Sequence, residues 1–236
     1  MNELFIQEII IDWNQVEADS YLREIQAVAG LKRLAFENPV TFFVGENGSG
    51  KSTLLEAIAV AYGFNPEGGT KNYNFSTYDS HSILHRGMTV AKGWRRPGWG
   101  YFFRAESFYN VATKEEEYAE DDSSQAYHRQ SHGESFLALA QNQIRPKGIY
   151  LFDEPEAALS PQRQLTLLLE IYRCAQQGAQ FIIVTHSPIL LGLPDAEILN
   201  FDGGEIHHCR YEDTGSYQLT EMFINRREEI LAKLLD

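Results

Sequence analysis

A phosphate-binding loop is the clearest chemical signal in the sequence. Residues 45–52 read Gly-Glu-Asn-Gly-Ser-Gly-Lys-Ser, the complete G-x-x-x-x-G-K-[ST] pattern. An apolar run at 40–44 precedes the loop and a helix-like segment at 52–62 follows it. Glycines let backbone N–H groups surround a polyphosphate, and a helix N-terminus favours its negative charge. The pattern predicts nucleotide binding, and a glycine-rich turn that merely caps a helix is the alternative.

The loop residues would share the binding of nucleotide and metal. We expect Lys51 to reach the β and γ phosphates. Ser52 would supply a hydroxyl to Mg²⁺, a hard cation that prefers oxygen ligands. The other expected ATP contacts are the rest of the loop and the residue after it: Gly45, Asn47, Gly48, Ser49, Gly50 and Thr53.

A second apolar run, at 149–152, leads directly into two carboxylates, Asp153 and Glu154. At the carboxyl edge of a parallel sheet they would lie where ligands bind. We expect Asp153 to hold Mg²⁺, directly or through a water, and Glu154 to accept a proton from the water that attacks the γ phosphate. A pair of acids that only begins a loop is the alternative.

Two further polar segments could contact the same ligand. His186 follows the apolar run 180–184 and would donate a hydrogen bond to the γ phosphate or order the attacking water, unless it is a structural histidine. Residues 131–135, Ser-His-Gly-Glu-Ser, precede a helical run and would present a hydroxyl and free N–H groups to an anion. An ordinary helix cap is the alternative for this segment.

Length and composition limit the other functions. A chain of 236 residues suits one sizeable α/β domain, and its net charge of −13 argues against a broad basic surface for nucleic acid, although a local groove could still be positive. No apolar run approaches the roughly 20 residues that cross a bilayer, and the N-terminus lacks signal-peptide features. We therefore expect a cytoplasmic protein without membrane insertion. The two cysteines and seven histidines show no zinc spacing.

The remaining elements follow from periodicity and turn signals. Alternating strands and helices predict a parallel sheet. Segment 63–100 is rich in turn residues and aromatics, so we expect irregular loops and short strands there. The predicted strands are 4–12, 40–44, 101–104, 148–152 and 180–184, with a terminal hairpin at 198–209, and the predicted helices are 52–62, 134–142, 161–177 and 219–235.

The four motifs, in this order, resemble those of ATP-binding-cassette ATPases. The loop at 45–52 corresponds to their phosphate loop, 131–135 to their signature, 149–154 to their metal and base motif, and His186 to their switch histidine. The segment 155–161, Pro-Glu-Ala-Ala-Leu-Ser-Pro, looks like the soluble branch of that family. That branch includes the heads of chromosome-maintenance and recombination-repair ATPases and small predicted bacterial AAA-type ATPases.

The resemblance implies a fold and an assembly. The fold would be an α/β P-loop NTPase with a mainly parallel central sheet, an N-terminal antiparallel β subdomain and a small helical signature subdomain. We expect one domain over 1–236, with the signature subdomain at about 105–145 and an irregular insertion at 64–100. Two such domains sandwich two ATPs in the family, so Ser131 and Gly133 would contact the γ phosphate in trans. The expected assembly is a homodimer on ATP binding, or a heterodimer with a related subunit.

Two positions of this sequence depart from the usual family pattern or offer alternatives. Glu106 stands where the family usually carries a glutamine, and it would be a metal-side ligand or a carboxylate at a helix start. The residue that stacks on adenine would be Tyr21, or Lys32 or Arg33 through cation stacking.

The expected function is a Mg²⁺-dependent ATPase that converts ATP and water to ADP and phosphate. Its dimer would couple hydrolysis to a partner protein or nucleic acid, in DNA repair, defence or regulation. The alternatives are the ATP-binding subunit of a membrane transporter and a low-turnover, ATP-gated binding module. A partner, a nucleic acid or plain packing would account for the basic and aromatic residues of segment 70–100: His81, His85, Arg86, Lys92, Trp94, Arg95, Arg96, Trp99 and Tyr101.

Overall fold

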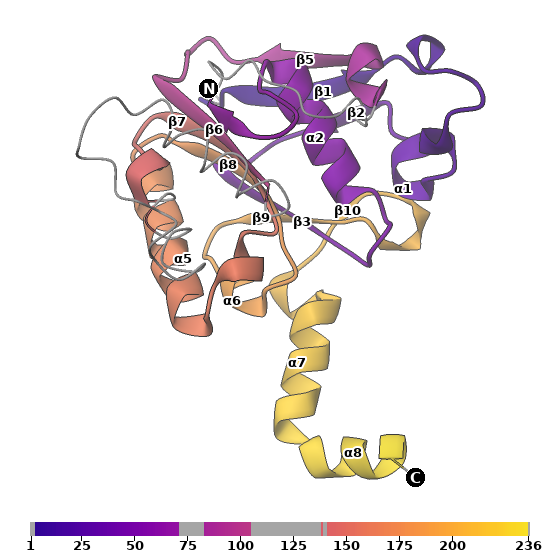
Figure 1. The fold of residues 1–236 in the computed structure, drawn as a ribbon, viewed down its shortest axis with the longest axis vertical. Helices are drawn as coiled ribbons and strands as arrows, with labels where there is room; N and C mark the ends of the chain where they lie inside the picture. The colour runs from indigo at the N-terminus through magenta and orange to yellow at the C-terminus, as the bar shows by residue number, and fades with distance from the viewer. Residues whose placement is uncertain (1–2, 71–82, 105–137, 139–140, 236) are drawn as a thin grey trace.

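A mainly parallel sheet and a smaller antiparallel sheet organise the chain (Figure 1). The computed structural model describes residues 3–70, 83–104, 138 and 141–235. Its strands are β1 Ile6–Ile11, β2 Arg33–Ala35, β3 Val40–Val44, β4 Gly69–Thr70, β5 Met88–Lys92, β6 Trp99–Arg104, β7 Gly148–Asp153, β8 Gln180–Val184, β9 Glu197–Asn200 and β10 His207–His208. Its α-helices are α1 Gln26–Ala29, α2 Lys51–Tyr62, α5 Pro161–Gln176, α6 Pro188–Leu191, α7 Gly215–Asn225 and α8 Arg227–Leu235.

Within the described residues, the central sheet has seven strands in the order β10-β9-β3-β8-β7-β6-β4. Strands β9, β3, β8, β7 and β6 run parallel, whereas β4 and β10 pair antiparallel at the two edges. Every residue of β3, β7 and β8 is buried. Continuous apolar runs of this kind form where a parallel sheet is covered on both faces. The parallel strands end together, and this common edge positions the motif residues.

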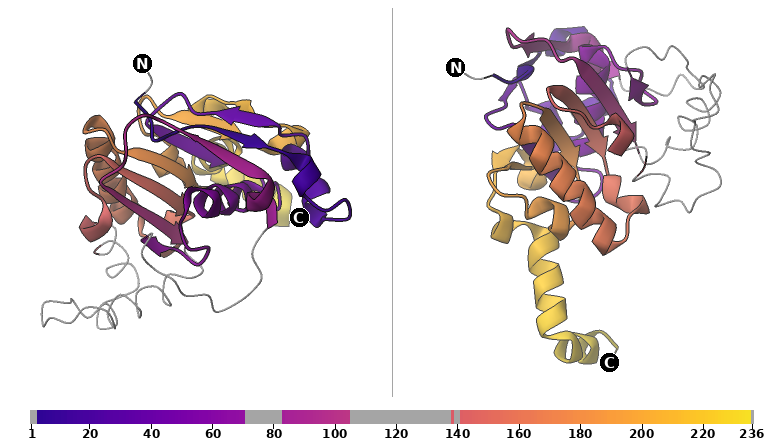
Figure 2. Two further views of the ribbon diagram at one scale, coloured as in Figure 1. Left: turned by 90° about the horizontal axis from the view of Figure 1, so that it is seen from above. Right: turned by 90° about the vertical axis from the view of Figure 1, so that its left-hand side faces the viewer.

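Alternate residues of the central strands point into two separate cores. Phe43 and Ile182 face the side of α2 and the antiparallel sheet, and Phe42 and Ile183 face the side of α5. Helix α2 packs against both sheets, and eight of its 12 residues are buried. Figure 2 shows α5 on the opposite side of the central sheet. The phosphate loop is therefore joined to a strand and a helix that are both fixed in the core.

The antiparallel sheet has the order β2-β1-β5, so its third strand comes from residues 88–92. Short strands were expected between irregular loops at 63–100, and β4 and β5 form there, in different sheets. The mainly parallel sheet and the antiparallel β part of the predicted fold class are confirmed. Most of the predicted helix 134–142, and of the signature subdomain at 105–145, lies outside the described residues, so the predicted division into subdomains stays a prediction.

Most predicted elements agree with the structure to within a few residues. The strands 40–44 and 180–184 are confirmed without change, and the terminal hairpin forms from β9 and β10. The prediction of a single closing helix over 219–235 was wrong, because two helices meet at Arg226. The backbone of Arg226 leaves the helical region, at φ −130° and ψ 33°. Its guanidinium binds Glu229 in the first turn of α8, so the charge pattern stays compatible with a helix although the backbone turns.

Helices α7 and α8 form an arm that projects from the body (Figures 1 and 2). No residue of 215–235 is buried in the structure, and the exposed apolar side chains include Leu219 and Ile224. At the root of the arm, the Tyr211 hydroxyl donates to the carbonyl oxygen of Pro188 at 2.9 Å. None of the helices in the described part of the chain is long and apolar enough to cross a bilayer.

Tyr150 of β7 predicts a loss of stability at high pH. Its ring is buried against Phe181, and its hydroxyl accepts the N–H of Arg145 at 2.6 Å and donates to the Arg145 carbonyl at 2.9 Å. Burial raises the pKa of Tyr150 to about 12. The unfolded chain therefore loses this proton first, near pH 10, and the free energy of unfolding falls as pH rises from about 10 to 12.

Tyr150→Phe should remove up to about 2 kcal/mol of this alkaline loss. Urea unfolding at pH 9, 10.5 and 11.5 measures the difference. The free energy of unfolding of this variant should still fall with pH, because burial also raises the pKa of Tyr62 to about 12. Tyr172→Phe, on an exposed face of α5, is the control and should keep the wild-type slope. An unchanged slope in Tyr150→Phe would contradict the prediction.

Candidate functional site

The phosphate loop joins β3 to α2 and has the backbone conformation that its glycines allow. Gly45, Gly48 and Gly50 have φ values of 136°, 83° and 97°, which side chains disfavour. The Lys51 ammonium donates to the carbonyl oxygens of Gly45 and Glu46, both at 2.7 Å. Burial lowers the pKa of Lys51, and the nearby carboxylates, Glu154 first among them, oppose this shift. The carbonyl groups of the loop thus hold the Lys51 ammonium in place.

Gly50 also permits close packing between the loop and α1. A Cβ atom at this position would lie 2.5 Å from Ile25 Cγ2 and 2.7 Å from Val28 Cγ2. Real Cβ atoms do not approach other atoms so closely, and Val28 is fully buried. The segment before β2 therefore helps to fix the shape of the loop.

Asp202 is a loop partner that the sequence analysis missed. It follows β9, and its Oδ1 accepts the N–H of Glu46 at 2.8 Å. A Cβ on Gly45 would lie 2.9 Å from the same oxygen. A signal was present, because Asp202 comes shortly after an apolar strand, but its Asp-Gly-Gly context indicated only a hairpin turn.

The two predicted metal-side residues meet across the sheet edge. The Ser52 hydroxyl donates to Asp153 Oδ1 at 2.8 Å, although the two residues are 101 positions apart. Arg104, opposite Asp153 in the β6–β7 register, binds Glu56 at 2.6 Å, and its Nε lies 3.9 Å from Asp153 Oδ2. A hydroxyl and a carboxylate are the ligands that Mg²⁺ takes beside phosphate oxygens, so this pair fits the predicted cation.

Glu154 and His186 also lie together. Their nearest atoms, Glu154 Oε1 and His186 Nε2, are 3.8 Å apart, and both side chains are partly exposed. Glu154 has a left-handed backbone, with φ 50°, and its N–H donates to Val184 O at 2.9 Å. Such a conformation costs free energy and is common at functional sites. The turn directs the carboxylate away from the strand and toward the histidine.

Glu156 is a second residue that the motifs did not reveal as part of the site. Its Oε1 accepts the backbone N–H of His186 at 2.6 Å. Burial raises the pKa of this carboxyl, and the hydrogen bond from His186 partly opposes the shift. Pro155 begins a short 3-10 helix that turns Glu156 back toward β8. A turn of this kind is not visible in the strand and helix periodicities, so no pattern in the residues indicated this contact.

Several predicted site residues remain predictions. Glu106, Ser131 and Gly133 lie outside the described residues. Among the adenine candidates, Arg33 makes two hydrogen bonds to Glu8, at 2.7 and 2.8 Å. Tyr21 is 56% exposed, and its 3-10 helix contacts α1, which packs against the loop. Which residue stacks on adenine therefore stays a prediction.

The basic and aromatic segment 83–104 makes many contacts within the chain. Lys92 lies over the Tyr62 ring, and Arg145 lies over the Trp99 ring. Tyr101 is buried, whereas Trp94 is 71% exposed. Packing thus accounts for several of these residues, and Trp94 remains the aromatic side chain that is open to a partner.

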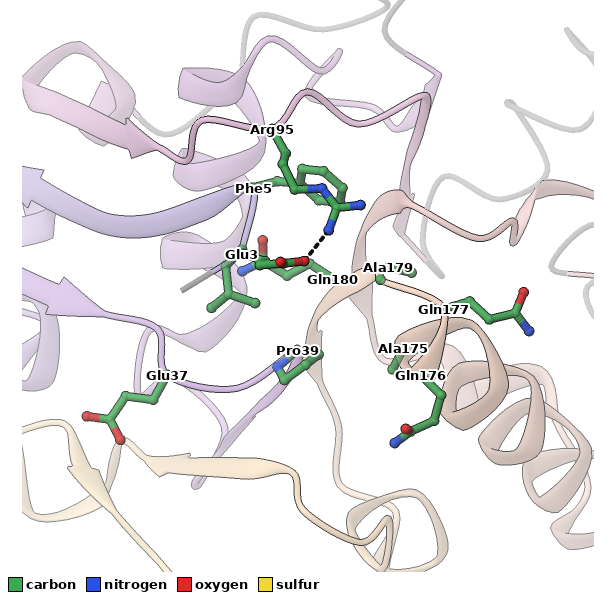
Figure 3. A pocket seen from close by; sticks show the side chains of 12 residues that line it. Glu3, Phe5, Glu37, Pro39, Arg95, Ala175, Gln176, Gln177, Ala179 and Gln180 are labelled. Atoms are coloured by element: carbon green, nitrogen blue, oxygen red, sulfur yellow. Dashed lines mark hydrogen bonds and ion pairs between the residues drawn. The ribbon is translucent and has the colours of Figure 1, made fainter. Parts of the chain in front are cut away.

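A cavity of about 600 Å³ lies away from these motifs (Figure 3). It is lined by Pro39 and Gln180, which stand at the opposite ends of β3 and β8 from the phosphate loop. Glu3 and Arg95 form an ion pair at its wall. The cavity is therefore not part of the motif site.

Solved structures match this chain at low sequence identity. The SMC head domain from Thermotoga maritima has 14% identity and a TM-score of 0.46, over 88% of this chain and 99% of that chain. A nucleotide-free ATP-binding cassette from an ABC transporter has 18% identity and a TM-score of 0.49, over 88% of this chain and 92% of that chain. No curated protein matches the sequence.

A family model described as an AAA domain matches residues 21–166. The matched span contains the phosphate loop, Asp153 and Glu154, and it is more than half of the 236 residues. The expectation of an ATPase-type nucleotide-binding domain is confirmed at this level. The chain belongs to the AAA-domain family.

Proposed function

We infer that this protein is a Mg²⁺-dependent ATPase. The observation that carries the inference is the 2.8 Å hydrogen bond between Ser52 and Asp153. It brings the hydroxyl of the phosphate loop and the carboxylate of the second motif to one point, beside Glu154 and His186. Family membership and the complete loop support ATP as the substrate.

The residues have distinct roles in this proposal. Ser52 and Asp153 would hold Mg²⁺, which supplies positive charge to the phosphate oxygens. Lys51 would exchange its two carbonyl contacts for phosphate oxygens. Glu154 would accept the proton of the attacking water, and His186 would orient that water or donate to the γ phosphate.

Hydrolysis itself tests the proposal. The purified chain should release phosphate from ATP in the presence of Mg²⁺ and lose this activity with excess EDTA. Asp153→Asn should raise the Mg²⁺ concentration needed for half-maximal rate by at least tenfold. Tight ATP binding without steady turnover would contradict the ATPase proposal and support a nucleotide-gated module.

The proposed active form is an ATP-sandwiched homodimer. Ser131 and Gly133 would complete the site from the second subunit, and a partner protein or nucleic acid would receive the work. The motif resemblance supports this assembly. Sedimentation of Glu154→Gln should show a doubling of mass with Mg-ATP, and a persistent monomer at high protein concentration would contradict the dimer.

Glu156 should act as a positioning residue for His186. Glu156→Ala removes the acceptor of the His186 N–H, and leaving that donor unpaired, at a cost of about 1–3 kcal/mol, should lower kcat by about 5- to 150-fold. Glu156→Gln keeps a carbonyl acceptor and should retain most of the rate. ATP affinity, measured by titration, should change little in either variant. Equal rates in Glu156→Ala and wild type would exclude the positioning role.

A further inference from the structure

Three potential metal ligands converge at the end of the central sheet opposite the phosphate loop. Glu37 precedes β3, Glu197 begins β9, and His208 ends β10. One ligand atom from each residue lies within 4.8 Å of the other two. The residues come from three separate segments, so the strand pairing itself brings them together.

Glu197 supplies the observation that distinguishes this cluster from ordinary surface charges. Its side chain is only 3% exposed. Oε2 accepts the Thr41 hydroxyl at 2.8 Å and the N–H of Glu37 at 3.3 Å. Oε1 is buried and has no hydrogen-bond partner in the part of the chain that the structure describes. A buried carboxylate oxygen without a partner is costly, so a ligand at Oε1 would satisfy it.

Oε1 points toward His208. Its distance to His208 Nδ1 is 3.6 Å, which is too long for a hydrogen bond. Two ligands that each lie about 2.1 Å from a tetrahedral ion are about 3.4 Å apart. The separation is therefore close to that of two atoms bound to one cation.

The other two side chains can adjust to complete such a site. The His208 side chain is 66% exposed, and Glu37 is exposed. Figure 3 shows Glu37 apart from the Glu3–Arg95 ion pair. The site would thus combine one fixed carboxylate with two movable ligands that are open to solvent, which leaves positions for water.

We propose that Glu37, Glu197 and His208 bind a divalent transition-metal cation. Imidazole suits Zn²⁺ and its first-row neighbours, whereas Mg²⁺ and Ca²⁺ prefer ligand sets made only of oxygen. The site is distinct from the one formed by Ser52 and Asp153, because β3 and β9 separate the two by their full length. It does not depend on the proposed ATPase activity.

Zinc titration calorimetry of the full chain tests the site. The protein is first treated with EDTA, dialysed, and kept free of nucleotide and phosphate. His208→Ala should weaken Zn²⁺ binding by at least tenfold, and Glu197→Gln should do the same. The matched control is His207→Ala, because this neighbouring histidine is also exposed and its Nδ1 faces the carbonyl of Glu205. It should bind as wild type does.

Two outcomes would overturn the proposal. One is the absence of wild-type binding up to about 100 µM Zn²⁺, and the other is equal binding by wild type and His208→Ala. The His208 variant decides even if Glu197→Gln fails to fold, since His208 is exposed. Asp153→Asn should keep Zn²⁺ binding, which separates this site from the nucleotide site.

Discussion

Glu154→Gln should lower the turnover of ATP by about 10²- to 10⁴-fold, the range that general-base catalysis contributes. Glutamine keeps the shape of the side chain but cannot take up a proton from water. The backbone at Glu154 is fixed by its hydrogen bond to Val184, so the turn should persist. Phosphate release under single-turnover conditions measures the chemical step, and titration with a fluorescent ATP analogue should show an affinity within a few-fold of wild type.

The matched control is Glu170→Gln, which removes an equal charge from the surface of α5. Glu170 contacts Arg173 at 3.3 Å and lies on a helix rather than at the sheet edge. Its turnover should equal that of wild type. If Glu154→Gln hydrolyses ATP at the wild-type rate, another group accepts the proton and the assignment of Glu154 is wrong.

Gly50→Ala should both destabilise the fold and weaken ATP binding. The new Cβ would overlap Ile25 Cγ2 and Val28 Cγ2, and the residue would keep a φ of 97° that alanine disfavours. Left-handed strain of about 1–2 kcal/mol and overpacking of about 1–3 kcal/mol together give a loss of about 2–5 kcal/mol in the free energy of unfolding. Relief of the overlap would move the loop away from α1, so ATP affinity should fall at least tenfold.

Gly48→Ala separates overlap from backbone strain. Gly48 has a φ of 83°, and no atom lies within 4 Å of a Cβ built there. This variant should lose only about 1–2 kcal/mol. Urea unfolding and ATP titration of the two variants give the comparison. Equal losses at positions 48 and 50 would show that contact with α1 does not shape the loop.

The elements that the sequence predicted well are those with strong local signals. Strands 40–44 and 180–184 each have four apolar residues out of five, and burial on both faces requires no alternation. The phosphate loop needs particular residues at fixed spacing, so its position between a strand and a helix followed directly. Ser52 and Asp153 could be placed together because the phosphate loop follows β3 and Asp153 ends β7, and parallel strands end at the same edge of the sheet.

The remaining features depend on contacts between distant segments. Strand β5 pairs with β1, and nothing local in its sequence indicates that partner. Asp202 reaches the phosphate loop because β9 pairs with β3. Glu156 reaches His186 because a 3-10 helix turns the chain back after β7. The break at Arg226 was missed since its ion pair with Glu229 is equally consistent with a continuous helix.

The arm formed by α7 and α8 has the geometry of a lever. Its root is held by the bond from Tyr211 to Pro188, and Pro188 is two residues beyond His186. The 11 residues of α7 span about 16 Å at 1.5 Å per residue. A rotation of about 10° at the root would therefore displace the far end of α7 by about 3 Å. A small rearrangement beside His186 that turned the root would thus be enlarged where the apolar side chains of the arm meet solvent.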